Sequence, residues 1–188
     1  MITATSILRE EHKAILKMID ATEQISERLK KGDDVSPELL SGLLEFFRNF
    51  ADRCHHGKEE ECLFPQLEQR GVPREGGPIG VMLHEHGQGR ELIRVLGETA
   101  CQFAGGQKEA GLRWADAALA YAALLRNHIA KENDVLFTMA DRFLSEADQA
   151  RIVGDFERIE TERLGAGTHE RLHALMDKLY GEIFPSSK

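Results

Sequence analysis

The stretch that decides the fold is residues 54–65, which read CHHGKEEECLFP. Residues 128–137, which read HIAKENDVLF, repeat its spacing: a His is followed four residues later by a Glu and then by Leu-Phe. In both stretches a Lys directly precedes the Glu. A His and a Glu four residues apart share one face of a helix, about 6 Å apart along its axis. Each stretch therefore predicts a helix that presents an imidazole and a carboxylate to the same neighbour.

Each of these two predicted helices follows another helix that carries a Glu-His pair. The pairs are Glu11-His12 and Glu85-His86, and the second His of each hairpin follows after a nearly equal number of residues. The chain thus contains two helical hairpins of the same design. Their candidate ligands are His12, His55 and Glu59 in the first hairpin and His86, His128 and Glu132 in the second.

This repeated set predicts a metal site. Four helices that turn these groups inward supply six ligands, including two carboxylates able to bridge, which is enough for two ions. Imidazole combined with carboxylate suits iron, manganese or zinc, and thiolate plays no evident part. A single His-x-x-x-Glu arises easily by chance, but its recurrence with matched partners does not. Burying so many ionisable groups without a cation would also be costly.

The helix boundaries follow from local signals. Gly32 after two lysines ends the first helix, Ser36-Pro37 caps the second, and Gly105-Gly106 separates the third from the fourth. Apolar periodicity predicts helices over about 5–31, 37–69, 78–103 and 107–143, with shorter ones over about 145–160 and 169–182. We predict an all-α chain with one domain over 1–188. It consists of an antiparallel up-and-down four-helix bundle over about 5–143 and a C-terminal extension of two helices over about 145–182.

Composition narrows the class of protein. The 188 residues are 41% hydrophobic and 30% charged, as expected for a soluble globular chain. The net charge of −8 disfavours nucleic-acid binding, and no apolar run reaches the length of about 18 residues that a membrane span needs. Cys54, Cys62 and Cys101 show no disulfide framework, so free thiols are expected. We predict a cytoplasmic protein without a nucleic-acid or membrane partner.

The ordered motifs resemble those of the hemerythrin-like, HHE cation-binding family. The resemblance covers about residues 5–143 and rests on the two Glu-His pairs, on HHGKEEECLFP and on HIAKE. It implies a four-helix bundle with two non-haem iron ions, Fe2+ or Fe3+, joined by an oxo or hydroxo bridge. The family's ligand positions fall on His12, His55, Glu59, His86, His128 and Glu132, with the two Glu bridging and the His residues capping the ions.

One position departs from the family pattern. Animal hemerythrins have a second His four residues before the position of His86, where this chain has Met82. His56 is the main candidate to replace it, and His84 is the weaker one. His56 and Glu60 are also four residues apart, so either register could face the metals. The match with the second hairpin selects His55 and Glu59, which leaves Glu60 and Glu61 as expected solvated residues.

Other residues are expected to have structural roles. Tyr121 lies two turns before His128 and is more simply a core residue than a pocket residue. Phe47, Phe50, Phe64 and Phe137 are expected in the bundle core. His169 and His173 are four apart on the last helix and are expected to form a surface pair.

Three functions fit such a centre. The first is reversible binding of O2, nitric oxide or peroxide, or redox sensing, which needs an open coordination position and a small gaseous or peroxide ligand. The second is an enzyme for peroxide or nitric-oxide detoxification, and the third is a structural metal or iron storage. The excess of His over Glu favours binding, so the chain leans away from an enzyme. The protein partner and the oligomeric state stay open, with a homodimer as one option.

Overall fold

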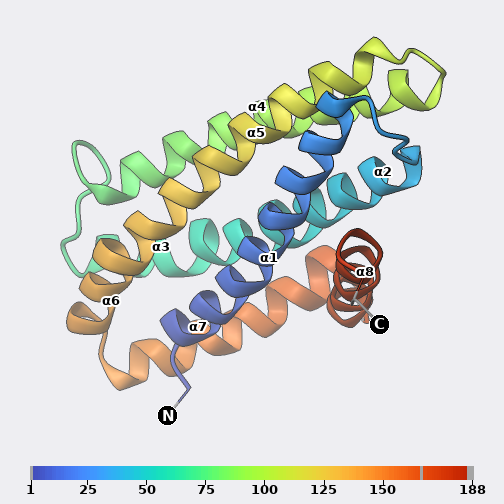
Figure 1. Cartoon of the computed structure of the whole chain (residues 1–188). Helices are drawn as coiled ribbons and strands as arrows, with labels where there is room; N and C mark the ends of the chain where they lie inside the picture. The colour runs from blue at the N-terminus through green and yellow to red at the C-terminus, as the bar shows by residue number, and fades with distance from the viewer. Residues whose placement is uncertain (1, 166, 186–188) are drawn as a thin grey trace.

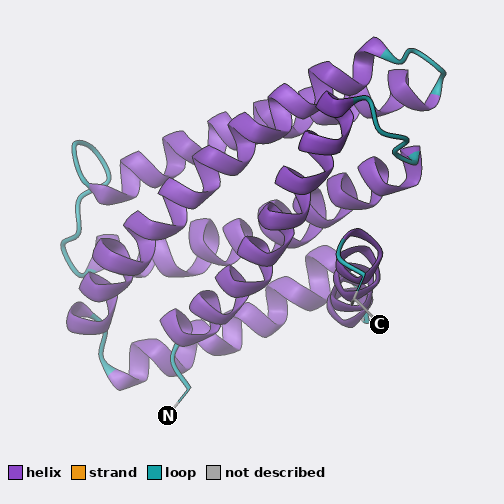
Figure 2. Ribbon diagram, in the orientation of Figure 1, coloured by secondary structure: helices purple, strands orange, loops and turns teal. Residues whose placement is uncertain are grey.

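The chain is built from helices alone in the part that the structure describes. The computed structural model describes residues 2–165 and 167–185, and Figure 2 shows helices joined by short loops throughout this part. The predicted all-α class is therefore confirmed. The helix ends also fall close to the predicted positions, except that the helical turns after residue 159 continue to Leu164.

Four long helical segments, which we call rods, make up the two hairpins. The first rod is α1, Ala4–Lys31. Thr3 and Ser6 form a capping box, in which each side chain accepts a hydrogen bond from the other residue's backbone N–H. Gly32 ends the helix in the left-handed conformation, with φ 79°, and its N–H bonds the carbonyls of Arg28 and Leu29. The predicted cap at Gly32 is thus present.

The second rod is a nearly continuous helix from Pro37 to Gln69, capped by the Ser36 side chain on the Leu39 N–H. Much of it is π-helical, with wider turns in which the N–H bonds the carbonyl five residues back. Its segments are α2 Pro37–Phe46, η1 Phe47–His56, η2 Glu59–Leu63 and α3 Phe64–Gln69.

The second hairpin repeats this arrangement. The third rod is α4, Pro78–Ala104, and the fourth consists of α5 Glu109–Lys131, η3 Glu132–Leu136 and α6 Phe137–Phe143. A π-helical turn therefore begins at Glu132, as another begins at Glu59. In Figure 1, α5 runs beside α4 in the opposite direction, and it also packs along α1.

The C-terminal extension lies against the first hairpin. It comprises α7 Glu146–Ile159, η4 Glu160–Leu164 and α8 Thr168–Ile183. Ser145 and Asp148 form the capping box that starts α7. In Figure 1, α7 and α8 lie beside α1 and away from α4, and both elements contact the first hairpin directly.

Two apolar clusters fill the interior and leave a polar layer between them. One contains Phe46, Phe47, Phe50, Trp114 and Tyr121, and the other is built around Phe64, Phe137 and Met82. The predictions that Tyr121 and the four phenylalanines are core residues are confirmed. Along α1, Leu8 belongs to the second cluster and Ile15 to the first, with His12 between them. The predicted ligands therefore lie in a polar layer between two apolar ones.

Two further sequence expectations can be compared with the structure. Cys54, Cys62 and Cys101 are free thiols, as predicted. No helix in the described part of the chain is both long enough and apolar enough to cross a membrane.

Candidate metal centre

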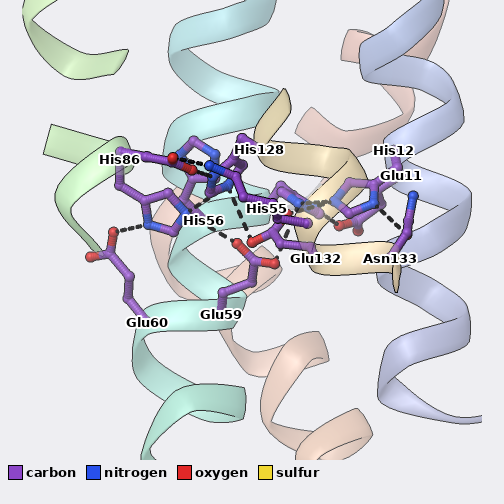
Figure 3. A network of polar contacts seen from close by, with 12 residues as sticks. Glu11, His12, His55, His56, Glu59, Glu60, His86, His128, Glu132 and Asn133 are labelled. Atoms are coloured by element: carbon purple, nitrogen blue, oxygen red, sulfur yellow. Dashed lines mark hydrogen bonds and ion pairs between the residues drawn. The ribbon is translucent and has the colours of Figure 1, made fainter. Parts of the chain in front are cut away.

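The structure brings all seven predicted ligand residues together in the polar layer (Figure 3). They come from all four rods, and each is almost completely buried. Their potential ligand atoms form two groups, and within each group these atoms lie within 4.8 Å of one another. The first group is His12, His55, Glu59 and Glu132, and the second is His56, His86, His128 and Glu59.

The histidines meet in pairs across each hairpin. The Nε2 atoms of His12 and His55 are 2.9 Å apart, and those of His86 and His128 are 3.1 Å apart. Two neutral imidazoles whose Nε2 lone pairs converge in this way repel each other unless a proton or a cation lies between them. The same geometry therefore recurs in both hairpins and favours a shared cation in each.

Two glutamates orient the histidines of the second and fourth rods through the far side of the rings. Glu11 lies 2.8 Å from Nδ1 of His55, and Glu85 lies 2.9 Å from Nδ1 of His128. A carboxylate at Nδ1 keeps the proton there, so that Nε2 keeps its lone pair for a cation. The Glu11-His12 and Glu85-His86 pairs of the sequence thus combine one ligand candidate with one orienting carboxylate.

A lysine completes each of these arrangements. Lys58 donates to Glu11, and Lys131 donates to Glu85. We call Glu11, His55 and Lys58 the first clamp, and Glu85, His128 and Lys131 the second clamp. Contact with the lysine and the histidine lowers the pKa of each glutamate, although burial raises it. Both clamp carboxylates are therefore ionised at neutral pH and attract a cation.

The other two paired histidines are oriented by residues at equivalent positions. Nδ1 of His86 lies 2.7 Å from Glu60, and Nδ1 of His12 lies 3.0 Å from the Asn133 side-chain oxygen. Arg90 also donates to Glu60, which is only partly exposed. The expectation that Glu60 is solvated is therefore wrong, whereas Glu61 is exposed as expected.

Glu59 and Glu132 lie between the two histidine pairs. The two oxygens of Glu132 are each 3.1 Å from an imidazole, one from Nε2 of His12 and the other from Nε2 of His128. The oxygens of Glu59 lie 3.7 Å from Nε2 of His55 and 3.4 Å from Nε2 of His86. Each carboxylate therefore spans both hairpins, as a bridge between two ions would.

These two carboxylates have no well-formed hydrogen bond within the described structure, although they are fully buried. Burial and the nearby Glu132 raise the pKa of Glu59 well above its usual range. Glu132 keeps a lowered pKa because His128 and His12 outweigh the effect of burial. Without a cation, such carboxylates lose their hydration and gain no well-formed hydrogen bond in its place. This observation indicates that the residues fit bound metal.

His56 lies beside His86, within the group of ligand candidates that includes His128 and Glu59. Its ring stacks on His86 with centroids 3.9 Å apart, and its Nδ1 has no hydrogen bond in the described structure. Met82 is buried in the apolar cluster, and His84 is exposed on α4, away from the centre. The wide turns of η1 and η2 let the adjacent His55 and His56 both face inward together with Glu59. His55 and Glu59 from one of the two alternative registers, and His56 from the other, therefore all face the centre.

The chemistry of the donor atoms narrows the choice of metal. Imidazole nitrogens and carboxylate oxygens are the only donors in the two groups. Cys54 lies directly before His55 but is absent from them, and burial raises its pKa to about 12, so it stays a thiol. Such a site suits iron, manganese or zinc rather than a soft metal that prefers thiolates.

Sequence reasoning missed the orienting residues. Glu11, Glu85, Lys58 and Lys131 were visible as repeated neighbours of the ligand candidates, but the repeat alone did not reveal what they contact. Asn133 and Glu60 carried no comparable signal, because they directly follow Glu132 and Glu59 without sharing a residue type. His169 and His173 also differ from expectation. They form the expected pair, but they are half-buried and pack their rings against Phe50 instead of lying freely on the surface.

Comparisons with known proteins show the family of the chain. The model of the hemerythrin HHE cation binding domain matches residues 3–140. An uncharacterized protein of Mycobacterium tuberculosis is 28% identical over 165 residues, which cover 87% of this chain and 64% of that protein. No solved structure matches the chain.

Other relatives carry a functional name. The iron-sulfur cluster repair protein DnrN of Neisseria gonorrhoeae is 38% identical over 107 residues, 55% of this chain and 67% of that protein. The iron-sulfur cluster repair protein YtfE of Edwardsiella ictaluri is 36% identical over 87 residues, 46% of this chain and 39% of that protein. The chain thus matches about two thirds or less of the length of these relatives.

Proposed function

Because the chain belongs to the hemerythrin HHE cation-binding domain family, we propose that its polar layer holds a non-haem di-iron centre that binds a small ligand reversibly. The observation that carries this proposal is the pair of fully buried carboxylates, Glu59 and Glu132, each placed between two histidine pairs and lacking a well-formed hydrogen bond. Two cations would satisfy both carboxylates and all the converging Nε2 atoms.

The ligands divide into two unequal sets. His12 and His55 would hold one iron, and His56, His86 and His128 would hold the other, with Glu59 and Glu132 shared. We infer that the four rods form an antiparallel up-and-down bundle around this centre. The ion with only two histidines has one protein ligand fewer, so we place the open coordination position there. The other set keeps three histidines, because His56 belongs to it while Met82 lies in the apolar cluster.

Small-ligand binding or redox sensing suits this composition of the site. When bound, iron alternates between Fe2+ and Fe3+ and can accept O2, nitric oxide or peroxide as a ligand. Five histidines against two glutamates favour reversible binding over oxidative chemistry. The chain's own contribution is to hold the imidazoles through the clamps and to exclude bulk water from the layer, since all seven side chains are buried. We expect no nucleic-acid partner for a chain with a net charge of −8.

The second candidate is an enzyme that handles iron or reactive nitrogen and oxygen species. Two relatives named iron-sulfur cluster repair proteins favour this second candidate, because about half of this chain aligns with each of them. The same centre would then remove peroxide or nitric oxide, or release and store iron. Among the described residues, no separate nucleophile or general base is evident around the centre, so such chemistry would depend on the metals.

Metal content and an optical spectrum test the proposal. Purified protein reconstituted with iron should contain about two irons per chain and show near-ultraviolet bands of a bridged diferric pair. His128→Ala should lose iron, whereas His84→Ala should keep it, because His84 is exposed outside the centre. A single zinc with no affinity for iron would reduce the centre to a structural metal site.

Turnover separates binding from catalysis. Peroxide added to the diferrous protein should be consumed in about one equivalent per centre if the protein senses or binds its ligand. Continued consumption over many equivalents, abolished in His128→Ala, would favour the enzyme.

A further inference from the structure

A third pair of converging histidines lies outside the centre, on α8. Nε2 of His169 and Nε2 of His173 are 2.9 Å apart, and the two rings are close to parallel, with centroids 4.7 Å apart. This separation equals that of His12 and His55 in the centre. The pair belongs to the C-terminal extension, beyond the residues 3–140 that match the family.

Glu160 orients His169 in the same way that the clamps orient their histidines. Its carboxylate lies 3.3 Å from Nδ1 of His169 and also accepts a hydrogen bond from Lys58 at 2.5 Å. A carboxylate at Nδ1 keeps the proton on that side and leaves the Nε2 lone pair free. Carboxylate, lysine and histidine thus form a third arrangement of the type seen in the first and second clamps.

The surroundings suit a bound cation. His169 and His173 line a pocket of about 510 Å³ between α1 and α8, together with Glu10 and Glu11. Lys58, which contacts Glu160, is already neutralised by Glu11 and Glu160. Phe50 packs against both imidazole rings, with centroids 5.6 Å and 5.3 Å away, and so limits their rotation. The site is therefore preformed, acidic and open to solvent on one side.

We propose that His169 and His173 form an additional site for one divalent transition-metal cation of the kind that prefers imidazole, such as Zn2+ or Fe2+. Their two Nε2 atoms are the protein ligands, Glu160 orients the first of them, and water fills the remaining positions. With two protein ligands instead of four or more, this site binds its ion more weakly than the centre. A histidine–histidine hydrogen bond with no metal affinity is the competing explanation.

Zinc binding to the full-length chain distinguishes the two explanations. Zinc is redox-inert, and equilibrium dialysis followed by elemental analysis gives its stoichiometry. The His169→Ala/His173→Ala double variant should bind one zinc fewer per chain than the unchanged protein. The exposed His84 provides the matched control, and His84→Ala should bind as many as the unchanged protein. Equal stoichiometry in the double variant and the unchanged protein would overturn the proposal.

Two further variants sharpen the result. Glu160→Gln keeps the shape of the side chain but removes its charge, so the zinc Kd of the additional site should rise about tenfold, as for other carboxylates that orient a metal-bound histidine. An unchanged Kd would refute the role of Glu160. His128→Ala should reduce binding at the centre and leave the zinc at His169 and His173 in place. The failure of one site is thus distinguishable from the failure of the other.

Discussion

The two hairpins place the same types of side chain around one centre, but only one of the two hairpins is covered by further helices of the described structure. Glu11, His12 and His55 in the first correspond to Glu85, His86 and His128 in the second, with closely similar distances. The first hairpin is covered by α7, η4 and α8, whereas the second has no such cover in the described structure. A repeated sequence motif therefore supplies the frame of the site, and the differences between its copies determine what each half can do.

The clearest difference lies next to the second histidine. His56 follows His55, while Ile129 follows His128 at the equivalent position, and both are buried. His55 lies within the π-helical segment η1, and a second such segment, η2, follows it. Only the short η3 follows His128. The extra imidazole turns inward toward His86 and His128, so the first hairpin contributes a ligand candidate to the second hairpin's ion.

The largest expected effect comes from the residues that both hairpins share. Glu59→Ala or Glu132→Ala should reduce iron from about two per chain to almost none, because each carboxylate contacts both histidine pairs. Iron content after reconstitution measures this effect. Glu61→Ala, on the exposed side of the same helix, is the control and should retain its iron. A Glu132→Ala protein that keeps two irons would exclude a bridging role.

Much of this comparison could be predicted from the sequence. The helix ends were visible because Gly32, Ser36 and Pro37 act within one turn of the chain. The ligand candidates were visible because a helical face repeats every three to four residues. The inward turn of both His55 and His56 was not visible, because the regular helical period places adjacent residues about 100° apart. This inward turn depends on the π-helical turns of η1 and η2, which no local residue pattern predicts.

The cover over the first hairpin was also beyond sequence reasoning. Helices over about 145–160 and 169–182 were predicted, but their position against α1 and η1 depends on contacts between segments far apart in the chain. Glu160 meets Lys58 across 102 residues, for example. Periodicity places His169 and His173 on one face of α8, yet it does not say that this face is turned toward Phe50.

The next prediction compares the lysines of the two clamps. The Lys58 side chain is 0% exposed, whereas that of Lys131 is 42% exposed. Lys58→Met should cost about 3–5 kcal/mol of unfolding free energy, since it leaves buried Glu11 uncompensated. Lys131→Met should cost about 0–1 kcal/mol, because water can replace an exposed partner. Urea denaturation measures both values, and equal losses would contradict the difference in burial between the clamps.

A smaller effect should follow from making the hairpins alike. His56→Ile copies the residue at the equivalent position, Ile129, and removes one imidazole from the His86 and His128 group. The protein should still take up two irons, but the iron held by His86 and His128 should be lost at about tenfold lower chelator concentration than in the unchanged protein. Chelator competition followed by absorbance measures the change. The control is His84→Ala, and an unchanged competition curve for His56→Ile would remove His56 from the set of ligands.

The smallest effect concerns the pH dependence of the contact between Glu160 of the C-terminal extension and Lys58 of the first clamp. Hydrogen bonding from His169, together with Lys58, lowers the pKa of Glu160 to about 2, from the ordinary value of 4.5. A carboxyl group whose pKa is lowered on folding stabilises the protein above the unfolded pKa and loses this contribution as the pH falls toward the folded pKa. Metal-free protein should therefore lose the Glu160 contribution between about pH 4.5 and 2.

Glu160→Gln isolates this contribution, because glutamine does not titrate. The gap in melting temperature between the unchanged protein and the variant should be widest above pH 4.5 and should narrow as the pH falls toward 2. The gap should be small throughout, since the carboxylate is partly exposed and water screens its interactions. A gap that stays constant over this range would mean that the charge of Glu160 does not hold the extension on the first hairpin, and that apolar packing of α7 and α8 alone accounts for the cover.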